Sequence, residues 1–234
     1  MLFRSGEVRS AAADRDTSAV IVRGAGRSFS SGWDLSEKLD HTSDLADDRA
    51  SLQEAAARFN AIWDCPIPVI AQVHGYCLAG AADLVLHCDL VVMAHDARFG
   101  HPAVRSLGVP SSNMWLYRLG PTLAKYLLFT GDTITGDEAV EHGLAIAAHD
   151  ASTLDEECLA LAERVAGSSR DTLIGNKRVL NHAIELMGRS ALQRFAQAED
   201  MLAHMSPSAQ AFREGARRDG LRAAFRERDA RFER

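Results

Sequence analysis

Apolar and polar positions along the chain follow two spacings, one typical of strands and one of helices. Short apolar runs at 17–23, 68–73 and 90–94 contain β-branched residues and predict buried strands. Between them, apolar residues recur every three to four positions over 51–64, which predicts an amphipathic helix. Residues 80–88 form a further run of helix formers. Strands that alternate with helices in this way predict an α/β core.

The second half of the chain follows a mostly helical pattern. Thr135 and Glu138 form a capping box that predicts the start of a short helix, and 143–148 predict a last short strand. We therefore predict two regions, a core at 1–150 and an α-helical region at 151–234. The helices expected in the second region cover 154–166, 172–187, 191–204 and 208–228.

Other stretches carry weaker signals. Residues 1–16 show a faint helical pattern rich in Arg, Ala and Asp, and 122–129 predict a short helix. Residues 36–50 are polar and predict a loop. A second loop is expected over 98–114.

Composition narrows the class of protein. The 234 residues are 47% hydrophobic, enough for one large core, and the net charge of −6 provides no basic surface for nucleic acid. No apolar run approaches the ~20 residues that span a bilayer, and the start lacks the apolar region of a signal peptide. The four cysteines form no Cys-x-x-Cys pair, and the nine histidines show no ligand spacing. We therefore expect a cytoplasmic protein with reduced thiols, no metal site and no membrane partner.

Two glycine-bearing turns follow predicted strands, at Gly24–Asp34 and at His74–Gly80. A glycine amide in the first turn of a helix can donate to an anion, because the early N–H groups lack helical partners. Two such turns could converge on one carbonyl oxygen. The simpler alternative is that their small residues only permit close packing. After the second turn, Asp83 and His87 are four residues apart and share one helix face.

Several other chemistries find little support in the sequence. Gly24-Ala25-Gly26 follows a strand as in a dinucleotide-binding fingerprint, but Phe29 occupies the position of the third glycine. The chain contains neither a Gly-Lys-Ser/Thr phosphate loop nor a Gly-x-Ser-x-Gly nucleophile turn.

The two turns resemble the signatures of the crotonase family, the enoyl-CoA hydratase/isomerase superfamily. Gly24–Asp34 is similar to Gly-x-Gly-Arg-x-Phe-x-x-Gly-x-Asp, and His74–Asp89 is loosely similar to Asn-Gly-x-x-x-Gly-Gly-Gly-x-Glu-Leu…Cys-Asp. Further similar stretches lie at 97–102, 107–110 and 128–136. The resemblance extends from about residue 17 to the end of the chain and indicates a family rather than one reaction.

The resemblance implies a fold and a set of partners. The expected architecture is a crotonase-like ββα spiral, followed by C-terminal helices that build a trimer or a dimer of trimers. The β-hairpin that opens such chains has no counterpart in the first sixteen residues. The implied ligand is an acyl-CoA thioester, with coenzyme A as part of the substrate and no separate cofactor.

The resemblance also assigns catalytic roles. The main-chain N–H groups of Trp33 and Gly80 would form an oxyanion hole for the thioester carbonyl. Hydratases of the family use two glutamates; the first matches Asp83 and the second falls at Ala103, which cannot transfer a proton. Asp83 could instead serve only to complement the helix dipole, and Trp33 could be an ordinary core aromatic.

Further residues are weaker candidates. Asp34, His101, Arg105, Ser111 and Ser112 could bind substrate or replace the missing second acid, although such loop residues are often structural or solvated. Near the C-terminus, the side chains that could reach the phosphates of CoA, or simply line a solvated helix face, are those of Arg217, Arg218 and Arg222.

The resulting prediction is an enoyl-CoA hydratase/isomerase-like lyase that stabilises a thioester enolate during addition, elimination or a double-bond shift. With Asp83 as the one carboxylate at a family position, a one-base reaction fits better than hydration. One alternative is a CoA-thioester or C–C hydrolase on the same fold. The other is a catalytically degenerate protein that binds acyl-CoA or merely assembles.

Overall fold

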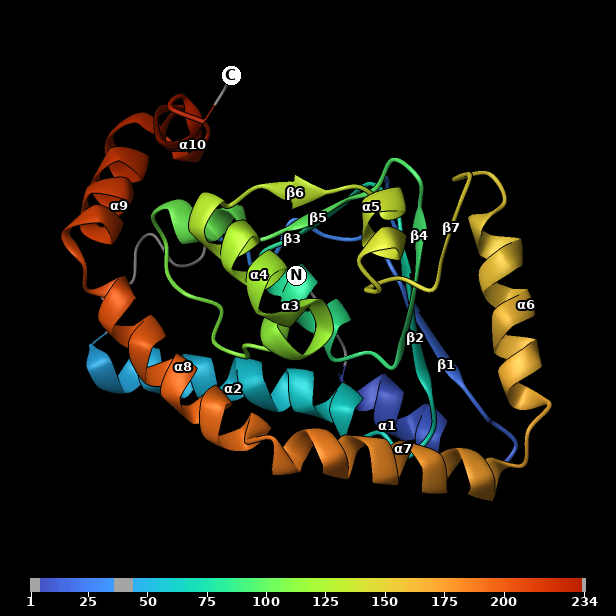
Figure 1. The fold of residues 1–234 in the computed structure, drawn as a ribbon. Coiled ribbons are helices and arrows are strands. Elements are labelled where there is room, and N and C mark those ends of the chain that lie inside the picture. Colours follow the sequence, from blue (N-terminus) through green and yellow to red (C-terminus); the bar gives the residue numbers. More distant parts are fainter. Residues whose placement is uncertain (1–4, 36–43, 233–234) are drawn as a thin grey trace.

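The computed structural model describes residues 5–35 and 44–232; part of the expected loop, 36–43, lies outside these ranges. At its centre is a parallel four-stranded sheet in the order β1-β2-β4-β7 (Figure 1). Its strands are β1 Val20–Arg23, β2 Val69–Val73, β4 Leu90–Ala94 and β7 Ala147–His149. The three strands predicted from apolar runs are confirmed, and all five residues of β2 are buried.

A second, smaller sheet lies beside the first. It contains β3 Tyr76–Leu78, β5 Arg98–Gly100 and β6 Thr133–Ile134, with β3 and β5 parallel and β6 antiparallel to β5. The chain passes from β2 to β3 at Gly75, whose φ of +56° suits glycine. Strands of two or three residues inside turns carry no periodicity, which explains why the prediction of a loop over 98–114 is wrong for β5.

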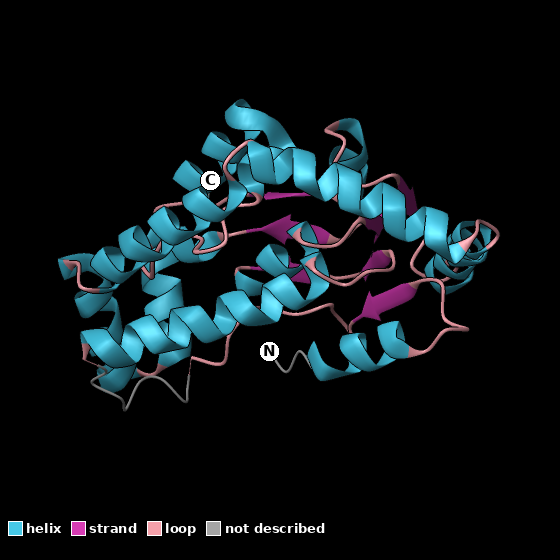
Figure 2. Cartoon of the chain, turned by 90° about the horizontal axis from the view of Figure 1, so that it is seen from below, coloured by secondary structure: helices cyan, strands magenta, loops and turns pink. Residues whose placement is uncertain are grey.

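Helices cover the sheets on both sides (Figure 2). Those packed around the strands are α1 Ser5–Ala13, α2 Leu45–Trp63, α3 Gly80–Leu86, α4 Trp115–Thr130, α5 Gly136–Glu141 and α6 Leu154–Ala166. One hydrophobic core joins them, and its largest fully buried side chains include Phe59, Ile62, Ile70, Leu84, Met93, Phe99 and Trp115. The α/β fold class is confirmed. No helix within the described ranges is long and apolar enough to cross a membrane.

α2 begins earlier than the sequence analysis predicted. The carboxylate of Asp44 caps it by accepting hydrogen bonds from the N–H groups of Ala46 (2.8 Å) and Asp47 (2.9 Å). Acidic residues in the first turn also favour the positive end of the helix. The predicted loop over 36–50 is therefore wrong for residues 45–50, where polar residues belong to a cap and an exposed first turn.

Two further element boundaries differ from the prediction. α4 extends well beyond 122–129, and a kink at Gly120 (φ +69°) before Pro121 separates its two parts. The capping box of α5 is confirmed, since Thr135 Oγ1 accepts from the Glu138 N–H at 3.1 Å. The strand predicted over 143–148 begins only at residue 147, because the N–H groups of Leu144 and Ala145 still bond back to α5.

The C-terminal helices follow one another around the outside of the sheets (Figure 1). α6 packs on the central sheet, and α8 lies against α2. The helix predicted over 208–228 is in fact two, because Gly220 adopts a φ of +84° between them. The helices that follow α6 are α7 Arg170–Leu186, α8 Arg189–His204, α9 Pro207–Asp219 and α10 Leu221–Asp229.

Candidate active site

The first glycine-bearing turn lies directly beside the second. Ser30 pairs with Cys77 of β3 as an isolated parallel bridge. Its N–H donates to the Tyr76 carbonyl at 2.9 Å, and its carbonyl accepts from the Leu78 N–H at 3.0 Å. The segment before Trp33 is thus joined to β3 by a single bridged residue. This pairing fixes the register of one turn against the other.

The two turns touch at their tips. Gly32 has a φ of +104°, and a Cβ there would lie 3.5 Å from the main-chain nitrogen of Gly80. A Cβ at Gly80 would in turn come within 3.0 Å of Cε2 in the Trp33 indole. Ala79, between the strand and α3, holds a positive φ of +53° that L-residues rarely adopt. The residues predicted to form the oxyanion hole, Trp33 and Gly80, are therefore neighbours in space.

The indole of Trp33 lies over Gly80 and reaches toward α2. It is half-buried, with its ring centroid 6.1 Å from that of Phe59. The Arg58 guanidinium lies 6.0 Å from the ring. The side chain thus packs against the core at one end and leaves part of its surface open. It can serve as a wall beside the two turns while its main-chain N–H remains a separate donor.

Asp83 is buried in the first turn of α3, with 3% of its surface exposed. The indole of Trp115 donates a hydrogen bond from Nε1 to Asp83 Oδ1 at 2.8 Å. On the other oxygen, His101 Nε2 lies 3.4 Å from Oδ2. A buried carboxylate needs such donors to offset its desolvation. Trp115 carries no local signal for this role, because it lies between the loop predicted to end at 114 and the helix predicted over 122–129.

His101 is 6% exposed and immediately precedes the 3₁₀ helix Pro102–Arg105. Its ring is edge-on to Trp115, with 5.9 Å between centroids. Among the described residues, its Nδ1 has no hydrogen-bond partner. If Nε2 carries a proton toward Asp83, Nδ1 is left with a free lone pair. Asp83 thus faces one ring nitrogen of His101, and the other is buried without a partner in the described part of the chain.

His87 does not join this pair. Its Nδ1 lies 2.7 Å from the main-chain oxygen of Asp83, not from its carboxylate. Burial lowers the pKa of His87 to about 4, so its ring is neutral near pH 7. It stacks on Phe59 with 5.4 Å between centroids. The shared helix face of Asp83 and His87 is therefore a packing feature.

The side chain of Arg105 is engaged in contacts within the protein. Its guanidinium pairs with Asp132 (3.1 Å) and with Asp229 of α10 (3.2 Å) and lies over the ring of Phe232. Its Nε also donates to the Thr130 carbonyl at 2.9 Å. These contacts tie α10 to the segment that carries His101. A role for Arg105 in binding substrate stays a prediction.

The remaining candidates are dispersed. Ser111 and Ser112 are buried in the loop before α4, and the hydroxyl of Ser112 has no hydrogen-bond partner in the part of the chain described. Asp34 is exposed just after Trp33. Ala103, at the position of the second glutamate, is partly buried in the 3₁₀ helix. Their roles stay predictions.

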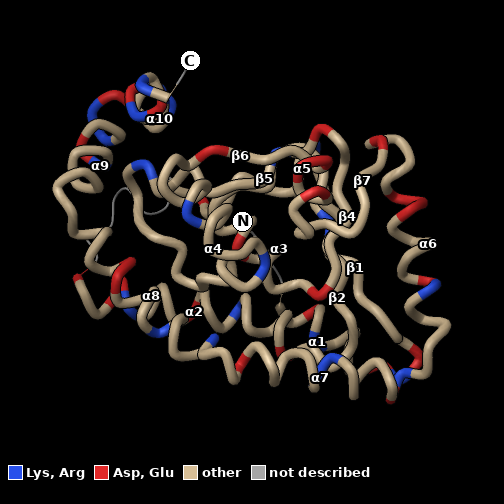
Figure 3. The backbone as a smooth tube through the Cα atoms, viewed as in Figure 1, with Lys and Arg blue, Asp and Glu red and all other residues tan. Residues whose placement is uncertain are grey.

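Three arginines predicted to reach CoA phosphates lie on the last two helices. Arg217 and Arg218 are in the last turn of α9, and Arg222 is in the first turn of α10. Arg218 pairs with its neighbour Asp219 at 2.7 Å on the surface. Figure 3 shows basic residues interspersed with acidic ones along both helices. A contact between these three arginines and the phosphates of CoA stays a prediction.

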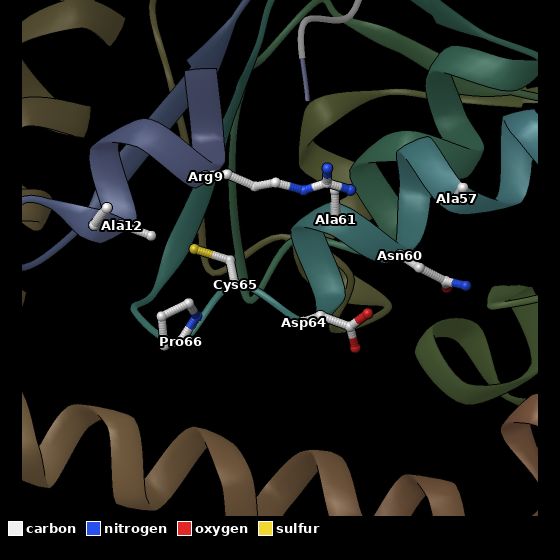
Figure 4. A pocket seen from close by; sticks show the side chains of 9 residues that line it. Arg9, Ala12, Ala57, Asn60, Ala61, Asp64, Cys65 and Pro66 are labelled. Atoms are coloured by element: carbon white, nitrogen blue, oxygen red, sulfur yellow. The ribbon is translucent and has the colours of Figure 1, made fainter. Parts of the chain in front are cut away.

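A cavity of about 580 Å³ lies elsewhere, between α1 and α2 (Figure 4). Arg9, Asn60, Asp64 and Cys65 are among its lining residues, and none of the predicted site residues is. All four cysteines are buried free thiols, and burial raises the pKa of Cys88 to about 12. The described residues contain no group of three or more side chains arranged to hold a metal ion.

A parallel sheet flanked by a second small sheet, with two touching glycine-bearing turns between them, is the arrangement that the resemblance to the crotonase family implies. The sequence model of the enoyl-CoA hydratase/isomerase family matches residues 8–233. The chain belongs to this family.

Individual relatives differ in the reaction for which they are named. The chain is 32% identical over 203 residues to a 2,3-dehydroadipyl-CoA hydratase of Escherichia coli, covering 84% of this chain and 77% of that one. It is also similar to a (7aS)-7a-methyl-1,5-dioxo-2,3,5,6,7,7a-hexahydro-1H-indene-carboxyl-CoA hydrolase of Mycobacterium tuberculosis. The two are 33% identical over 175 residues, which cover 74% of this chain and 70% of that one. A solved enoyl-CoA hydratase/isomerase from Xanthobacter autotrophicus matches with a TM-score of 0.92 and 36% identity, covering 98% and 88%.

Proposed function

We propose that this protein binds an acyl-CoA thioester and holds the charge of its enolate between the main-chain N–H groups of Trp33 and Gly80. The contact between the two turns supports this proposal, because donors fixed in advance need no reorganisation when charge develops. Each such donor contributes about 10²–10³-fold in rate. Coenzyme A enters as part of the substrate, and the proposal requires no other cofactor.

The buried pair Asp83–His101 is the observation that carries the proposed chemistry. Asp83 is held by Trp115 at 2.8 Å and faces His101 Nε2 at 3.4 Å, while Nδ1 of His101 has no partner among the described residues. Asp83 then orients the imidazole and stabilises the imidazolium that forms, and His101 carries the proton. This assignment changes the role of Asp83 from base to orienting group.

The reaction that best fits one proton carrier is a double-bond shift or an elimination. His101 Nδ1 removes a proton from Cα, the carbon next to the thioester carbonyl. In a conjugated enoyl ester it can remove one from Cγ instead. The electron pair moves onto the carbonyl oxygen between Trp33 and Gly80. In a double-bond shift the same proton returns at another carbon. In an elimination the enolate pair forms the double bond between Cα and Cβ, and the β-substituent leaves with the pair of its own broken bond. In both reactions the proton taken from the substrate ends either on His101 or on the product.

Hydration is less well supported. The resemblance implies that hydratases of the family hold one water between two carboxylates. Ala103 occupies the position of the second carboxylate. Ala103 can neither hold the water nor return its proton. The proposal therefore places isomerisation or elimination ahead of hydration.

A hydrolase is the second candidate. The free nitrogen of His101 could instead remove a proton from a water that attacks a carbonyl, with the same two N–H groups holding the tetrahedral oxyanion. The 33% identical relative from Mycobacterium tuberculosis, named a CoA hydrolase, supports keeping this candidate. Its product would be free CoA or a ring-opened acyl-CoA.

Proton exchange provides the decisive experiment. The protein is incubated in deuterium oxide with saturated, 2-enoyl and 3-enoyl CoA esters, and the recovered esters are analysed by mass spectrometry. We expect deuterium uptake and interconversion of the two enoyl esters. His101→Gln should lower the rate about 10²–10⁴-fold. Release of free CoA would instead favour the hydrolase, and tight binding without exchange would indicate a degenerate protein.

A matched control separates chemistry from folding. His182 is exposed on α7, away from the pair, and His182→Gln should exchange deuterium at the wild-type rate. Equal exchange by His101→Gln and by the wild type would contradict the assigned role of His101.

We also propose a homo-oligomer, a trimer or a dimer of trimers, formed through the C-terminal helices. α7 and α8 carry a set of exposed large apolar side chains, which monomers rarely leave uncovered. They are Val179, Leu180, Leu186, Phe195 and Leu202. Light scattering after size exclusion should give three or six chains, and Phe195→Asp should shift the mass downward. A monomeric wild type at micromolar concentration would contradict this proposal.

A further inference from the structure

A second group of charged side chains lies behind the loop that follows His101. Asp200 and His204 are one turn apart on α8. Asp200 is 6% exposed, and its Oδ1 accepts a hydrogen bond from the N–H of Val109 at 2.8 Å. The two bonded residues are 91 positions apart, so no local pattern predicts the contact.

The loop approaches α8 so closely that only glycine fits. Gly108 adopts a φ of +151°, and a Cβ there would lie 3.0 Å from Nε2 of His204 and would also overlap Asp200 Oδ1. The backbone of the loop thus rests directly on the two side chains. Asp200 holds the segment between the 3₁₀ helix after His101 and the buried Ser111.

His204 lies between two carboxylates. Its Nδ1 is 3.0 Å from Asp48 Oδ2 on α2, and its Nε2 is 3.4 Å from Asp200 Oδ1. A neutral imidazole has one donor and one acceptor nitrogen, so two facing carboxylates require either an imidazolium or a protonated carboxyl. The group therefore stores a proton and links the first turn of α2, α8 and the loop.

The charge of Asp200 also acts on the proposed catalytic pair. Burial is the main cause that raises the pKa of Asp200 to about 6, and the charge of Asp83 raises it further. His204, the Val109 N–H and His101 act in the opposite direction. The interaction between two charges is mutual, so Asp200 also acts electrostatically on the pair Asp83–His101.

We infer that Asp200 is a positioning residue of the acyl-CoA site: it anchors the loop through Val109 and supplies a negative charge that biases proton transfer at Asp83 and His101. The catalytic part of this inference rests on the proposed function. Its structural part, the anchoring of the loop by the hydrogen bond from the Val109 N–H to Asp200, exists with or without turnover.

Two substitutions separate the anchor from the charge. Asp200→Asn keeps an oxygen for the Val109 N–H and removes the charge, whereas Asp200→Ala removes both. For Asp200→Asn we expect the acid limb of the kcat/KM profile to move to lower pH by about 0.5 unit, with KM within about twofold of wild type. Removal of a negative charge disfavours the uptake of a proton by any group nearby, which gives the shift this sign. Asp200→Ala should in addition raise KM about tenfold, because the loop loses its anchor.

The matched control is Asp137→Asn on α5. Asp137 also faces a histidine, with its Oδ1 2.6 Å from Nδ1 of His95, but this pair is on the surface. We expect an unchanged pH profile and KM for this control. An Asp200→Asn protein that melts like the wild type and keeps the wild-type acid limb would overturn the inference.

Fluorescence tests the coupling without any substrate. With Trp33→Phe and Trp63→Phe as background, Trp115 is the one tryptophan left, and an imidazolium at the edge-on His101 should quench its emission. Asp200→Asn should move this pH-dependent quenching to lower pH. If it does so while the wild-type protein, with Trp33 in place, turns over no acyl-CoA, the inference stands and the proposed function falls. An unchanged quenching curve overturns the inference whatever the activity.

Discussion

The two sides of the candidate site are built in different ways. The oxyanion side consists of the Gly32–Trp33 and Ala79–Gly80 turns, which follow their strands directly and meet through β3. The proton-transfer side, around His101, is held by partners from distant parts of the chain: Trp115, Asp200 and Asp229. The first side is encoded in short motifs, whereas the second depends on tertiary contacts. Substitutions far along the chain can therefore alter the surroundings of His101 without touching the two turns.

The largest effect is expected on the oxyanion side, from Gly80→Ala. The added Cβ would lie 2.9 Å from Cδ1 of the Trp33 indole, so the indole or the turn must move. We expect a loss of about 10²–10³-fold in kcat for the acyl-CoA reaction, the scale of one misplaced donor. Steady-state kinetics measure it. Gly26→Ala, in the first turn but with open space at its Cβ, should keep kcat within twofold.

A smaller effect is expected from Trp115→Phe on the proton-transfer side. The change removes the Nε1 donor from buried Asp83 Oδ1 and leaves a small cavity. Both consequences destabilise the fold, by about 2–4 kcal/mol together. Urea unfolding measures the free energy, and kcat should fall with it because Asp83 is no longer held toward His101. A variant as stable as the wild type would show that the hydrogen bond contributes nothing.

Arg105→Met tests how far the C-terminal helices support the same side. The arginine links Thr130, Asp132 and Asp229, and its side chain is 12% exposed. Loss of these partly buried contacts should cost about 1–2 kcal/mol of unfolding free energy. Proteolysis should release α10 before the core unfolds. Arg218→Met, whose pair with Asp219 is exposed, should have the stability and the proteolysis pattern of the wild type.

The smallest effect, and the one of opposite sign, is expected from Ala79→Gly. Ala79 holds a φ of +53° and a ψ of −127°, a conformation that glycine adopts without strain. The substitution should stabilise the protein by about 1 kcal/mol. Thermal unfolding measures the change. A destabilised variant would show that the methyl group, near the Cβ position of Gly32, contributes more through packing than it costs in strain.

Sequence reasoning predicts the elements that carry the Trp33 and Gly80 turns well and the contacts around His101 poorly. The buried run before His74, the glycines and the capping box of α5 are local signals, and the structure confirms the elements that they predict. Trp115 contacts Asp83 across 32 positions and Asp200 contacts Val109 across 91, so neither has a local signature. Short elements such as β3 and β5 are missed for a similar reason, since three residues show no periodicity.

The central claim is that the N–H groups of Trp33 and Gly80 polarise one thioester carbonyl. Isotope-edited vibrational spectroscopy of a bound acyl-CoA, labelled with ¹³C at that carbonyl, measures this polarisation directly. We predict a carbonyl stretch at lower frequency than for the same ester in water, with the shift abolished by Gly80→Ala and retained by His101→Gln. A bound carbonyl with the frequency of the free ester in water would contradict the account.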